Sequence, residues 1–316
     1  MRRTRNITNA APEKRADAIL TADWHLRDNV PICRGDEFEP AQWAKVNFVK
    51  HLQKTHYCPV IHAGDLFNHW RPSPYLLGKA IEHLPDEFYT IYGNHDLPQH
   101  NFEERSKSGI HVLERAGQLS VLGKSVEYFE FPVGARKMSV IEGVHWGYTP
   151  VGIEGDFHRK ILVYHIMTYQ GKKPWPGITD PRAGGILRKY PEYDLILTGH
   201  NHKAFVETCQ SRLLVNPGSL TRQDADQIDF QPRVYLYYAD TNTCEPCFLP
   251  CKSNAVNRSH IDRSSERDDR IDAFISKLGG NYDAGLDFGA NLERFFKTNN
   301  IDKEVEQKVY KAIEHD

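Results

Sequence analysis

The sequence predicts an α/β protein in which two β-sheets pack together and are flanked by helices, with a short helical extension at the C-terminal end. Three observations predict this fold class. Apolar runs of four to seven residues, rich in Ile, Val, Leu, Tyr and Phe, recur along the chain. Helical stretches separate the first of these runs. Gly and Pro turns separate the later ones.

The first part of the chain is predicted to alternate strands and helices. The runs "DAILTAD", "PVIHAGD" and "FYTIYGNHD" are typical of strands that are buried on both faces. Two amphipathic helices are expected between them, in "PAQWAKVNFVKHLQKTH" and "SPYLLGKAIEHL". Their apolar stripes are Trp43, Val46, Val49 and Leu52 in the first, and Leu77, Ala80, Ile81 and Leu84 in the second. This alternation predicts βαβ units.

The later part of the chain is predicted to form a second sheet that packs on the first. The apolar runs "KILVYHI" and "DLILTGHNH" have the same character as the early strands. Between Lys137 and Tyr238, "KMSVIEGV", "KAFVET", "RLLVN" and "RVYLYYAD" alternate with turn residues.

Four segments are expected along the chain. Residues 1–16 form a basic N-terminus, read as a solvated tail or alternatively as an arm that contacts phosphates. Residues 17–251 form the main domain, 252–270 a polar linker, and 271–316 a helical extension. The extension carries two apolar stripes: Ile271, Phe274, Ile275 and Leu278, then Ile301, Val305, Val309 and Ile313. Each stripe is expected either to dock on the chain's own core or to bind a partner helix.

Composition places few limits on function. Apolar residues make up 40% of the chain and the net charge is −2, so any nucleic-acid surface must be a local patch. No apolar run approaches the ~20 residues that span a bilayer, and the N-terminus lacks the apolar middle of a signal peptide. We therefore expect a soluble, cytoplasmic protein without a membrane partner.

The cysteines allow two interpretations. "CEPCFLPC" contains Cys244, Cys247 and Cys251, and Cys209 would complete a structural zinc site. The alternative is a set of free thiols on a strand and its turn.

Polar side chains gather where the predicted strands end. The set is Asp23, His25, Asp65, Asn94, His165, His200 and His202. Imidazole, carboxylate and amide ligands suit Mn, Fe or Zn. Strand ends in open α/β sheets converge on one place. Seven ligands are too many for one tetrahedral ion, but they suit two ions ~3.5–4 Å apart that clamp a phosphoryl group.

In order, the motifs D-x-H, G-D, G-N-H-D, a lone His and G-H-x-H resemble those of the calcineurin-like metallophosphoesterases. Here they stand as "DWH", "GD", "GNHD", His165 and "GHNH", and the resemblance covers Asp17 to Tyr238. "AGDLFNHWRPSP", "YGNHDLP" and "NPGSLTR" are most similar to SbcD-type DNA repair nucleases, which work with an SMC-like ATPase. His69 occupies the position of an arginine that protein Ser/Thr phosphatases of the superfamily carry.

The resemblance implies a two-sheet metallophosphoesterase sandwich and a role for each motif residue. It implies a first metal held by Asp23, His25 and His202, a second held by Asn94, His165 and His200, and Asp65 bridging the two. His95 would face the scissile phosphate, Asp96 would orient His95, and a metal-bound hydroxide would be the nucleophile. The expected metals are Mn²⁺, with Fe, Zn or Mg as alternatives.

The chain departs from the nuclease pattern at two points. The resembling nucleases usually place a histidine after G-D-x-F, where this chain has Asn68 followed by His69. Either His69 substitutes catalytically or exonuclease activity is weakened; Asn68 and Arg71 are candidate substrate-binding residues. The cap looks reduced, because some 65 residues follow Cys251, which suits a stand-alone enzyme of phages and prophages.

The leading prediction is a metal-dependent phosphodiester hydrolase that acts as a DNA nuclease. One alternative is a phosphodiesterase or phosphatase for a nucleotide or another small molecule. Another is a metal-bound scaffold for a partner ATPase. The expected partners are DNA, a second copy of the chain and an SMC-like ATPase.

Overall fold

The computed structural model describes residues 14–123, 127–130, 138–258 and 288–313. The chain divides into two compact units, Met1–Asn257 and Arg258–Asp316. The N-terminal tail predicted for residues 1–16 falls almost entirely outside the described residues, as does the stripe from Ile271 to Leu278.

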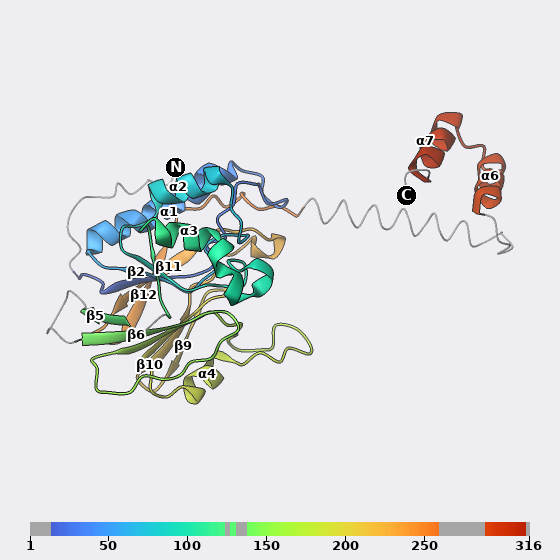
Figure 1. Ribbon diagram of the computed structural model, residues 1–316. Helices are drawn as coiled ribbons and strands as arrows, with labels where there is room; N and C mark the ends of the chain where they lie inside the picture. The colour runs from blue at the N-terminus through green and yellow to red at the C-terminus, as the bar shows by residue number, and fades with distance from the viewer. Residues whose placement is uncertain (1–13, 124–126, 131–137, 259–287, 314–316) are drawn as a thin grey trace, which may run out of the picture. The chain divides into compact units, whose positions relative to one another are not determined.

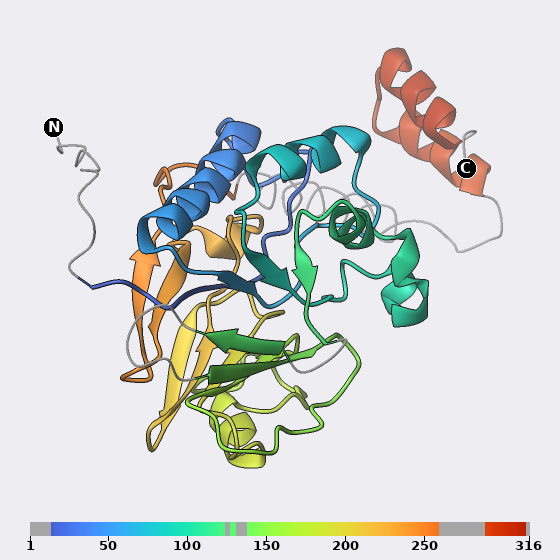
Figure 2. The same ribbon diagram turned by 60° about the vertical axis from the view of Figure 1, so that its left-hand side comes forward.

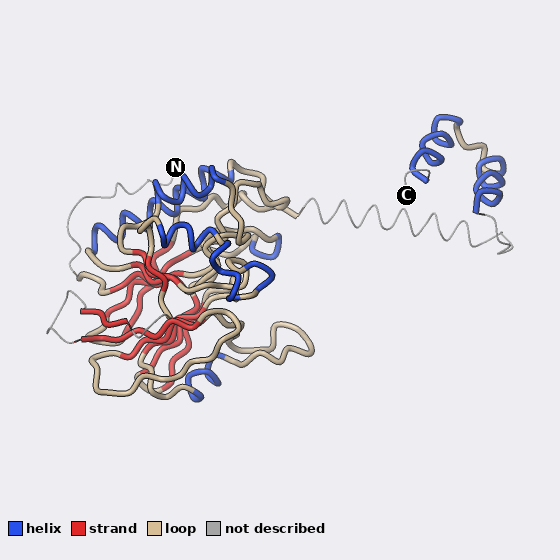
Figure 3. Tube along the Cα trace, viewed as in Figure 1, coloured by secondary structure: helices blue, strands red, loops and turns tan. Residues whose placement is uncertain are grey.

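The first unit contains two six-stranded sheets that face each other (Figures 1 and 3). The first sheet, in spatial order, consists of β12 (Thr243–Phe248), β11 (Arg233–Tyr238), β1 (Ala18–Thr21), β2 (Val60–His62), β3 (Phe88–Thr90) and β4 (Ser120–Val121). The second consists of β5 (Glu127–Glu130), β6 (Met138–Val144), β7 (Lys160–Tyr164), β8 (Leu195–Thr198), β10 (Arg212–Asn216) and β9 (Phe205–Cys209). The predicted fold class is confirmed.

Four neighbouring strands of each sheet are parallel. In the first sheet β1, β2, β3 and β4 run in one direction. In the second sheet β6, β7, β8 and β10 do so. Their apolar side chains fill the space between the sheets, as Leu20, Ile61, Ile161, Val163 and Leu197 illustrate. Both faces of these strands are covered, which explains why the sequence shows continuous apolar runs and little alternation.

One predicted strand lies in the other sheet. The run "RVYLYYAD" was expected in the second sheet, but β11 pairs antiparallel with β1, with Ile19 opposite Leu236, and belongs to the first. The apolar pattern of a strand indicates which side chains are buried but does not indicate which distant strand it pairs with. Sequence order alone therefore placed β11 in the wrong sheet.

Helices cover the outer faces of the sheets (Figure 2). On the first sheet lie α1 (Phe38–His56), α2 (Pro74–His83) and α3 (Gly109–Arg115), and α4 (Ala183–Lys189) packs on the second. Short 3₁₀ turns are η1 (Pro98–His100), η2 (Phe102–Lys107) and η3 (Ala225–Gln227). Among the described residues, none of the helices combines the length and apolar character needed to cross a bilayer.

Helices α1 and α2 follow their predicted apolar stripes with one exception. In α1, Trp43, Val46 and Val49 are buried. In α2, Ser73 caps the first turn by accepting a hydrogen bond from the main-chain N–H of Leu76 at 3.1 Å. Ile81, predicted on the buried stripe, is 44% exposed, and Leu76 is buried instead, because Leu76 and Ala80 define the inward face at a spacing of four.

The zinc interpretation of the cysteines is wrong, because the four thiols do not gather at one place among the described residues. Cys244 and Cys247 lie three residues apart on β12, so their side chains pack on opposite faces of the first sheet. Cys209 belongs to β9 in the other sheet. No metal-binding group among the described residues contains a cysteine.

The second unit contains α6 (Phe288–Thr298) and α7 (Lys303–Ile313). Leu292, Phe295 and Phe296 of α6 form a small apolar cluster, and Ile301 and Val309 pack against it. Part of the predicted stripe is therefore used inside the extension itself, whereas Val305 is 49% exposed.

Lys45 on α1 is a buried cation, and we predict that Lys45→Met stabilises the protein. Its side chain is 2% exposed, and its ammonium donates to the carbonyl of Ala41 in the same helix. Burial, and then the neighbouring Arg34, lower the pKa of Lys45 to about 8. Methionine keeps the length of the apolar stem without the charge. Thermal melts at pH 7 should show a rise of roughly 2–4 °C.

The pH dependence provides the check on this prediction. The folded-state pKa of Lys45, about 8, lies below the unfolded value of 10.5, so the unfolded chain binds more protons between these values. The stability of the wild type relative to the variant should therefore rise with pH over this window, and the advantage of Lys45→Met should shrink. Lys54→Met, on the exposed side of the same helix, is the control. A gain that persists unchanged at pH 10 would contradict this explanation.

Candidate metal centre

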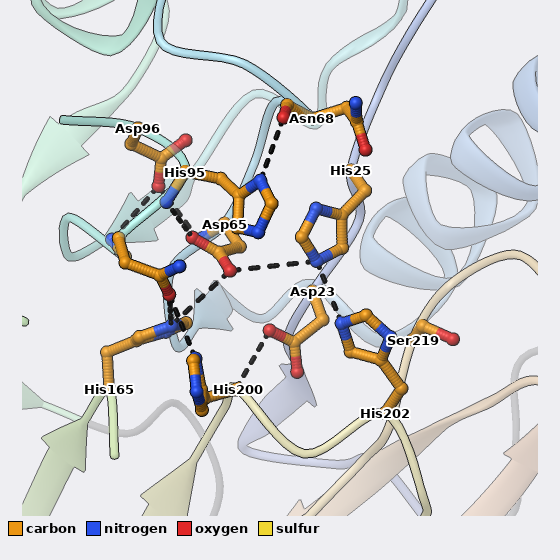
Figure 4. Close-up of polar contacts among 12 residues, drawn as sticks. Asp23, His25, Asp65, Asn68, His95, Asp96, His165, His200, His202 and Ser219 are labelled. Carbon is orange, nitrogen blue, oxygen red and sulfur yellow. Dashed lines mark hydrogen bonds and ion pairs between the residues drawn. The ribbon is translucent and has the colours of Figure 1, made fainter. Parts of the chain in front are cut away.

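The carboxyl ends of five strands from both sheets meet at one place (Figure 4). The loop after β1 supplies Asp23 and His25, and the loop after β2 supplies Asp65. The loop after β3 supplies Asn94, the loop after β7 supplies His165, and the loop after β8 supplies His200 and His202. The structure thus brings together all seven side chains that the sequence singled out as ligands.

The backbone at this centre is held in unusual conformations. Four of the seven residues have positive φ although none is glycine: Asp23 (51°), His25 (45°), Asp65 (59°) and His200 (75°). Each such residue costs about 1–3 kcal/mol and persists only where the surroundings fix it. Strain of this kind concentrates at functional sites.

Two glycines before the ligands are required by close packing. A Cβ on Gly93 would lie 2.1 Å from Oδ1 of Asp65, and a Cβ on Gly64 would lie 2.6 Å from Nδ1 of His165. Both distances are far below contact distance, so only glycine allows these loops to approach each other, as their position before the ligands predicted.

The first group of side chains is Asp23, His25 and His202, whose ligand atoms lie within 4.8 Å of one another. The Nε2 atoms of His25 and His202 are 3.0 Å apart. Oδ1 of Asp23 accepts a hydrogen bond from the main-chain N–H of His200 at 2.9 Å, whereas its Oδ2 is buried without a hydrogen-bond partner. A buried carboxylate oxygen with a free lone pair beside two imidazoles fits a metal ion.

The second group is Asp65, His165 and His200, joined by Asn94. Nδ1 of His165 lies 2.7 Å from the carbonyl of Ala63 and must donate to it. Its Nε2 therefore points to Oδ1 of Asn94 at 3.1 Å and to Oδ2 of Asp65 at 3.4 Å, and would present a lone pair to them in the neutral ring that a metal ion requires. Three electron-rich atoms that face one another need a positive charge between them.

Burial and neighbouring charges shift the pKa values of the centre in both directions: burial lowers the pKa of His200 to about 4 and that of His25 well below its usual range. Burial works against a charged imidazole, yet the carboxylate of Asp65 outweighs it and raises the pKa of His165 to about 9. Burial alone would raise the pKa of Asp65, but His165 and then His25 hold that pKa well below its usual range. Burial raises the pKa of Asp23 to about 6. The clustered imidazole nitrogens and carboxylate oxygens are themselves ligand types that divalent metal ions bind.

Asp65, a member of the second group, also approaches the first group. Its Oδ2 is 3.6 Å from Nε2 of His25 in the first group and 3.4 Å from Nε2 of His165 in the second. Its Oδ1 accepts a hydrogen bond from the main-chain N–H of His95 at 2.9 Å, which fixes the direction of the carboxylate. One carboxylate so placed can serve two neighbouring ions.

The sequence predicted that Asp96 orients the ring of His95, but the hydrogen-bond partner of that ring is Asn68. Nδ1 of His95 donates to the main-chain carbonyl of Asn68 at 2.8 Å. The carboxylate of Asp96 accepts hydrogen bonds from main-chain N–H groups of Asp65 (2.7 Å), Phe67 (3.2 Å) and Gly93 (3.0 Å). Asp96 thus ties the loops after β2 and β3 together, because a buried carboxylate accepts from whichever N–H groups converge on it.

The remaining predicted residues lie at the rim. The carbonyl of Asn68 contacts His95, and the side chain of Asn68 lies on the side of the centre where His25 is found (Figure 4). His69 and Arg71 are exposed, and Nδ1 of His69 accepts from the main-chain N–H of Arg71 at 3.2 Å. Neither joins a metal-binding group among the described residues, so the structure does not bring His69 to the centre.

Sequence reasoning missed two neighbours of the histidines. Asp224 places Oδ2 3.7 Å from Nδ1 of His202, and the ring of Trp146 stacks on His200 with centroids 4.8 Å apart. A carboxylate on the second ring nitrogen of a metal-binding histidine fixes its orientation. No motif marked either residue, since Asp224 and Trp146 meet the histidines only through the folding of separate loops.

Comparison with known proteins places residues 18–236 within the model of the calcineurin-like phosphoesterase superfamily domain. Three solved structures are similar at low identity. An archaeal phosphodiesterase is 14% identical with a TM-score of 0.40, covering 73% of this chain and 99% of its own. TT1561 of Thermus thermophilus is 12% identical with a TM-score of 0.43, covering 74% and 98%. GAP50, the anchor in the inner membrane complex of Plasmodium, is 11% identical with a TM-score of 0.47, covering 75% and 90%.

Proposed function

This chain belongs to the calcineurin-like phosphoesterase superfamily, and on that premise we propose that it hydrolyses phosphodiesters with two divalent metal ions. The observation that carries the proposal is the pair of adjacent clusters of imidazole and carboxylate ligand atoms, in which Oδ2 of Asp23 is buried without a hydrogen-bond partner. The proposed ligands are Asp23, His25 and His202 for one ion, Asn94, His165 and His200 for the other, and Asp65 for both. Mn²⁺ is the proposed metal, since these ligands combine imidazole with oxygen.

The ions would hold the phosphoryl group between them and supply a strong nucleophile at neutral pH. The chain's own contribution to proton transfer comes from His95. Because Nδ1 of His95 donates to the carbonyl of Asn68, its Nε2 is left for the centre, where a ring nitrogen of His95 lies within 4.8 Å of ligand atoms of His25 and Asp65. A proton on this Nε2 can pass to the leaving oxygen as its bond to phosphorus breaks.

We further propose that the phosphodiester belongs to DNA, which makes the protein a nuclease. Support comes from the segments that resemble DNA repair nucleases, since two of them build the centre. "AGDLFNHWRPSP" contains Asp65 and Asn68, and "NPGSLTR" contains Leu220, whose main-chain N–H donates to the carbonyl of Asp23 at 3.1 Å.

The proposal is tested with the full-length protein and Mn²⁺ on three substrates: linear duplex DNA, circular single-stranded DNA and bis(p-nitrophenyl) phosphate. Hydrolysis of the small diester that stops with a chelator supports the two-metal function, and release of nucleotides from either DNA supports the nuclease. Hydrolysis of the small diester without any cleavage of DNA would overturn the nuclease and leave a small-molecule phosphodiesterase. No metal-dependent hydrolysis of any substrate would overturn both.

We predict that Asn68→His increases the degradation of duplex ends while leaving hydrolysis of bis(p-nitrophenyl) phosphate nearly unchanged. The substitution keeps the main-chain carbonyl that holds His95 and adds an imidazole at the rim, where the resembling nucleases carry one. Release of acid-soluble nucleotide from labelled duplex DNA measures the effect. Asn47→His, on an exposed position of α1, is the control. An unchanged rate on duplex DNA would mean that this position does not govern the processing of ends.

A further inference from the structure

A pocket of about 640 Å³ opens directly beside the candidate metal centre. His200 and His202 form the wall that it shares with the centre, and Trp175 and Phe230 add aromatic rings to its lining. Its size lies in the range of sites that receive a small organic ligand, ~300–1,000 Å³. The residues that the sequence predicted for substrate binding, Asn68 and Arg71, do not line it.

Trp175 stands on a loop whose composition restricts its conformations. The loop reads GKKPWPG from Gly171 to Gly177, with a proline on each side of Trp175. Each proline fixes one backbone dihedral, and the two glycines form the bends with φ of 74° and 83°. The indole is 50% exposed. A half-exposed ring on a restricted loop loses little entropy when a flat ligand stacks on it.

The base of this loop is tied to the strand end that carries the histidines. Oγ1 of Thr168 donates to the carbonyl of Pro181 at 2.8 Å and closes the base. The amide of Asn201, the residue between the two histidines of the GHNH motif, donates to the carbonyl of Thr168 at 2.7 Å. These two hydrogen bonds tie the base of the Trp175 loop to the strand end that carries the histidines.

The charges around the pocket disfavour a phosphate chain inside it. Asp224 and Asp226 both line it, and among the described lining residues Lys203 is the one lysine or arginine. A second phosphate group would be repelled by these carboxylates. A nucleobase and its sugar carry no charge and can donate hydrogen bonds to carboxylates. The occupant that fits is therefore one nucleoside attached to the phosphate that lies at the metals.

We propose that this pocket receives one unpaired nucleoside of the substrate, with its base stacked on Trp175 and its phosphate at the metal centre. The proposal rests on the phosphodiester hydrolysis proposed above and names the substrate class of that site. Stacking on an aromatic side chain requires an accessible base face, which a base inside a duplex does not offer. A single-stranded end or a nucleotide ester can supply it.

The test compares two chromogenic diesters, with and without a base, in the full-length protein with Mn²⁺. The diesters are thymidine 5′-(p-nitrophenyl phosphate) and bis(p-nitrophenyl) phosphate. Trp175→Ala should raise KM for the thymidine ester about 10-fold, as expected for one lost base stack, with little change in kcat. Its kinetics on the base-free ester should not change. Trp175→Phe keeps an aromatic face and should restore most of the affinity.

A binding measurement is independent of catalysis. In the presence of a chelator, a short fluorescein-labelled oligothymidylate should bind the wild type more tightly than Trp175→Ala in an anisotropy titration. Tyr75→Ala on α2 removes an aromatic ring of similar exposure (53%) away from the pocket and should match the wild type. If the thymidine ester responds to Trp175→Ala and the oligonucleotide does not, the pocket serves free nucleotides.

The outcomes separate this proposal from the one on which it rests. Wild-type protein that hydrolyses both esters, together with a Trp175→Ala variant that changes both equally or neither, overturns the nucleoside pocket and leaves phosphodiester hydrolysis standing. Wild-type protein that hydrolyses neither ester with metal overturns both proposals.

Discussion

Asp65→Asn is expected to remove hydrolysis of bis(p-nitrophenyl) phosphate almost completely and to lower the content of both metals. The asparagine keeps an oxygen that can accept from the N–H of His95, so the loop can retain its shape. It loses the charge that lies 3.4–3.6 Å from one imidazole of each group. Because both proposed ions would share this carboxylate, the loss should exceed the ~10–100-fold effect that is usual for residues behind the ligands.

Two measurements check the prediction for Asp65. Elemental analysis should show substoichiometric metal in the variant and two ions in the wild type. Mn²⁺ should raise the melting temperature of the wild type, since an ion that binds only the folded state stabilises it, and should do so much less for the variant. Asp86→Asn, at an exposed carboxylate, is the matched control. Full occupancy of both metals in Asp65→Asn would show that Asp65 does not bridge them.

His95→Ala is expected to lower kcat by ~10²–10⁴-fold while both metals remain bound, the range for a side chain that transfers a proton. Its Nδ1 is occupied by the carbonyl of Asn68, which leaves Nε2 for the centre beside His25 and Asp65. His95→Asn can keep the hydrogen bond to Asn68 but has no atom in place of Nε2. It should therefore be as slow as His95→Ala.

The competing interpretation is that His95 is itself a metal ligand, since its ring nitrogen lies within 4.8 Å of ligand atoms of His25 and Asp65. Metal analysis of the two His95 variants separates the interpretations, with His111→Ala as a histidine control on α3. If the His95 variants lose one ion as well as activity, His95 is a metal ligand and the proposal that it transfers a proton is wrong.

Much of this centre could be predicted because its residues occupy local patterns. The apolar run in "DLILTGHNH" predicts a buried strand that ends just before the two histidines. Its continuous apolar composition also predicts that both faces of this strand are buried. The glycines before Asp65 and Asn94 predicted that two loops approach each other closely. The structure shows this approach, since Gly93 packs against Asp65.

Other features depend on which distant segments pair with each other, and no local sequence pattern predicts such pairing. β11 reads as a strand, but its place beside β1 follows from the pairing of segments more than 200 residues apart. The same is true of Asp96, whose neighbours are N–H groups from two loops, and of Trp175, whose exposure beside the histidines no periodicity predicts.

The sequence by itself determined the fold class, the strand ends and the side chains that meet there, because helix and strand periods and turn residues act within a few positions. The tertiary structure alone decided that Nε2 of His25 lies 3.0 Å from Nε2 of His202, 177 positions later. It also decided that Asn68 rather than Asp96 holds the ring of His95, and that a pocket with Trp175 opens beside the centre. These contacts arise from the packing of two sheets, which brings together residues that no local pattern relates.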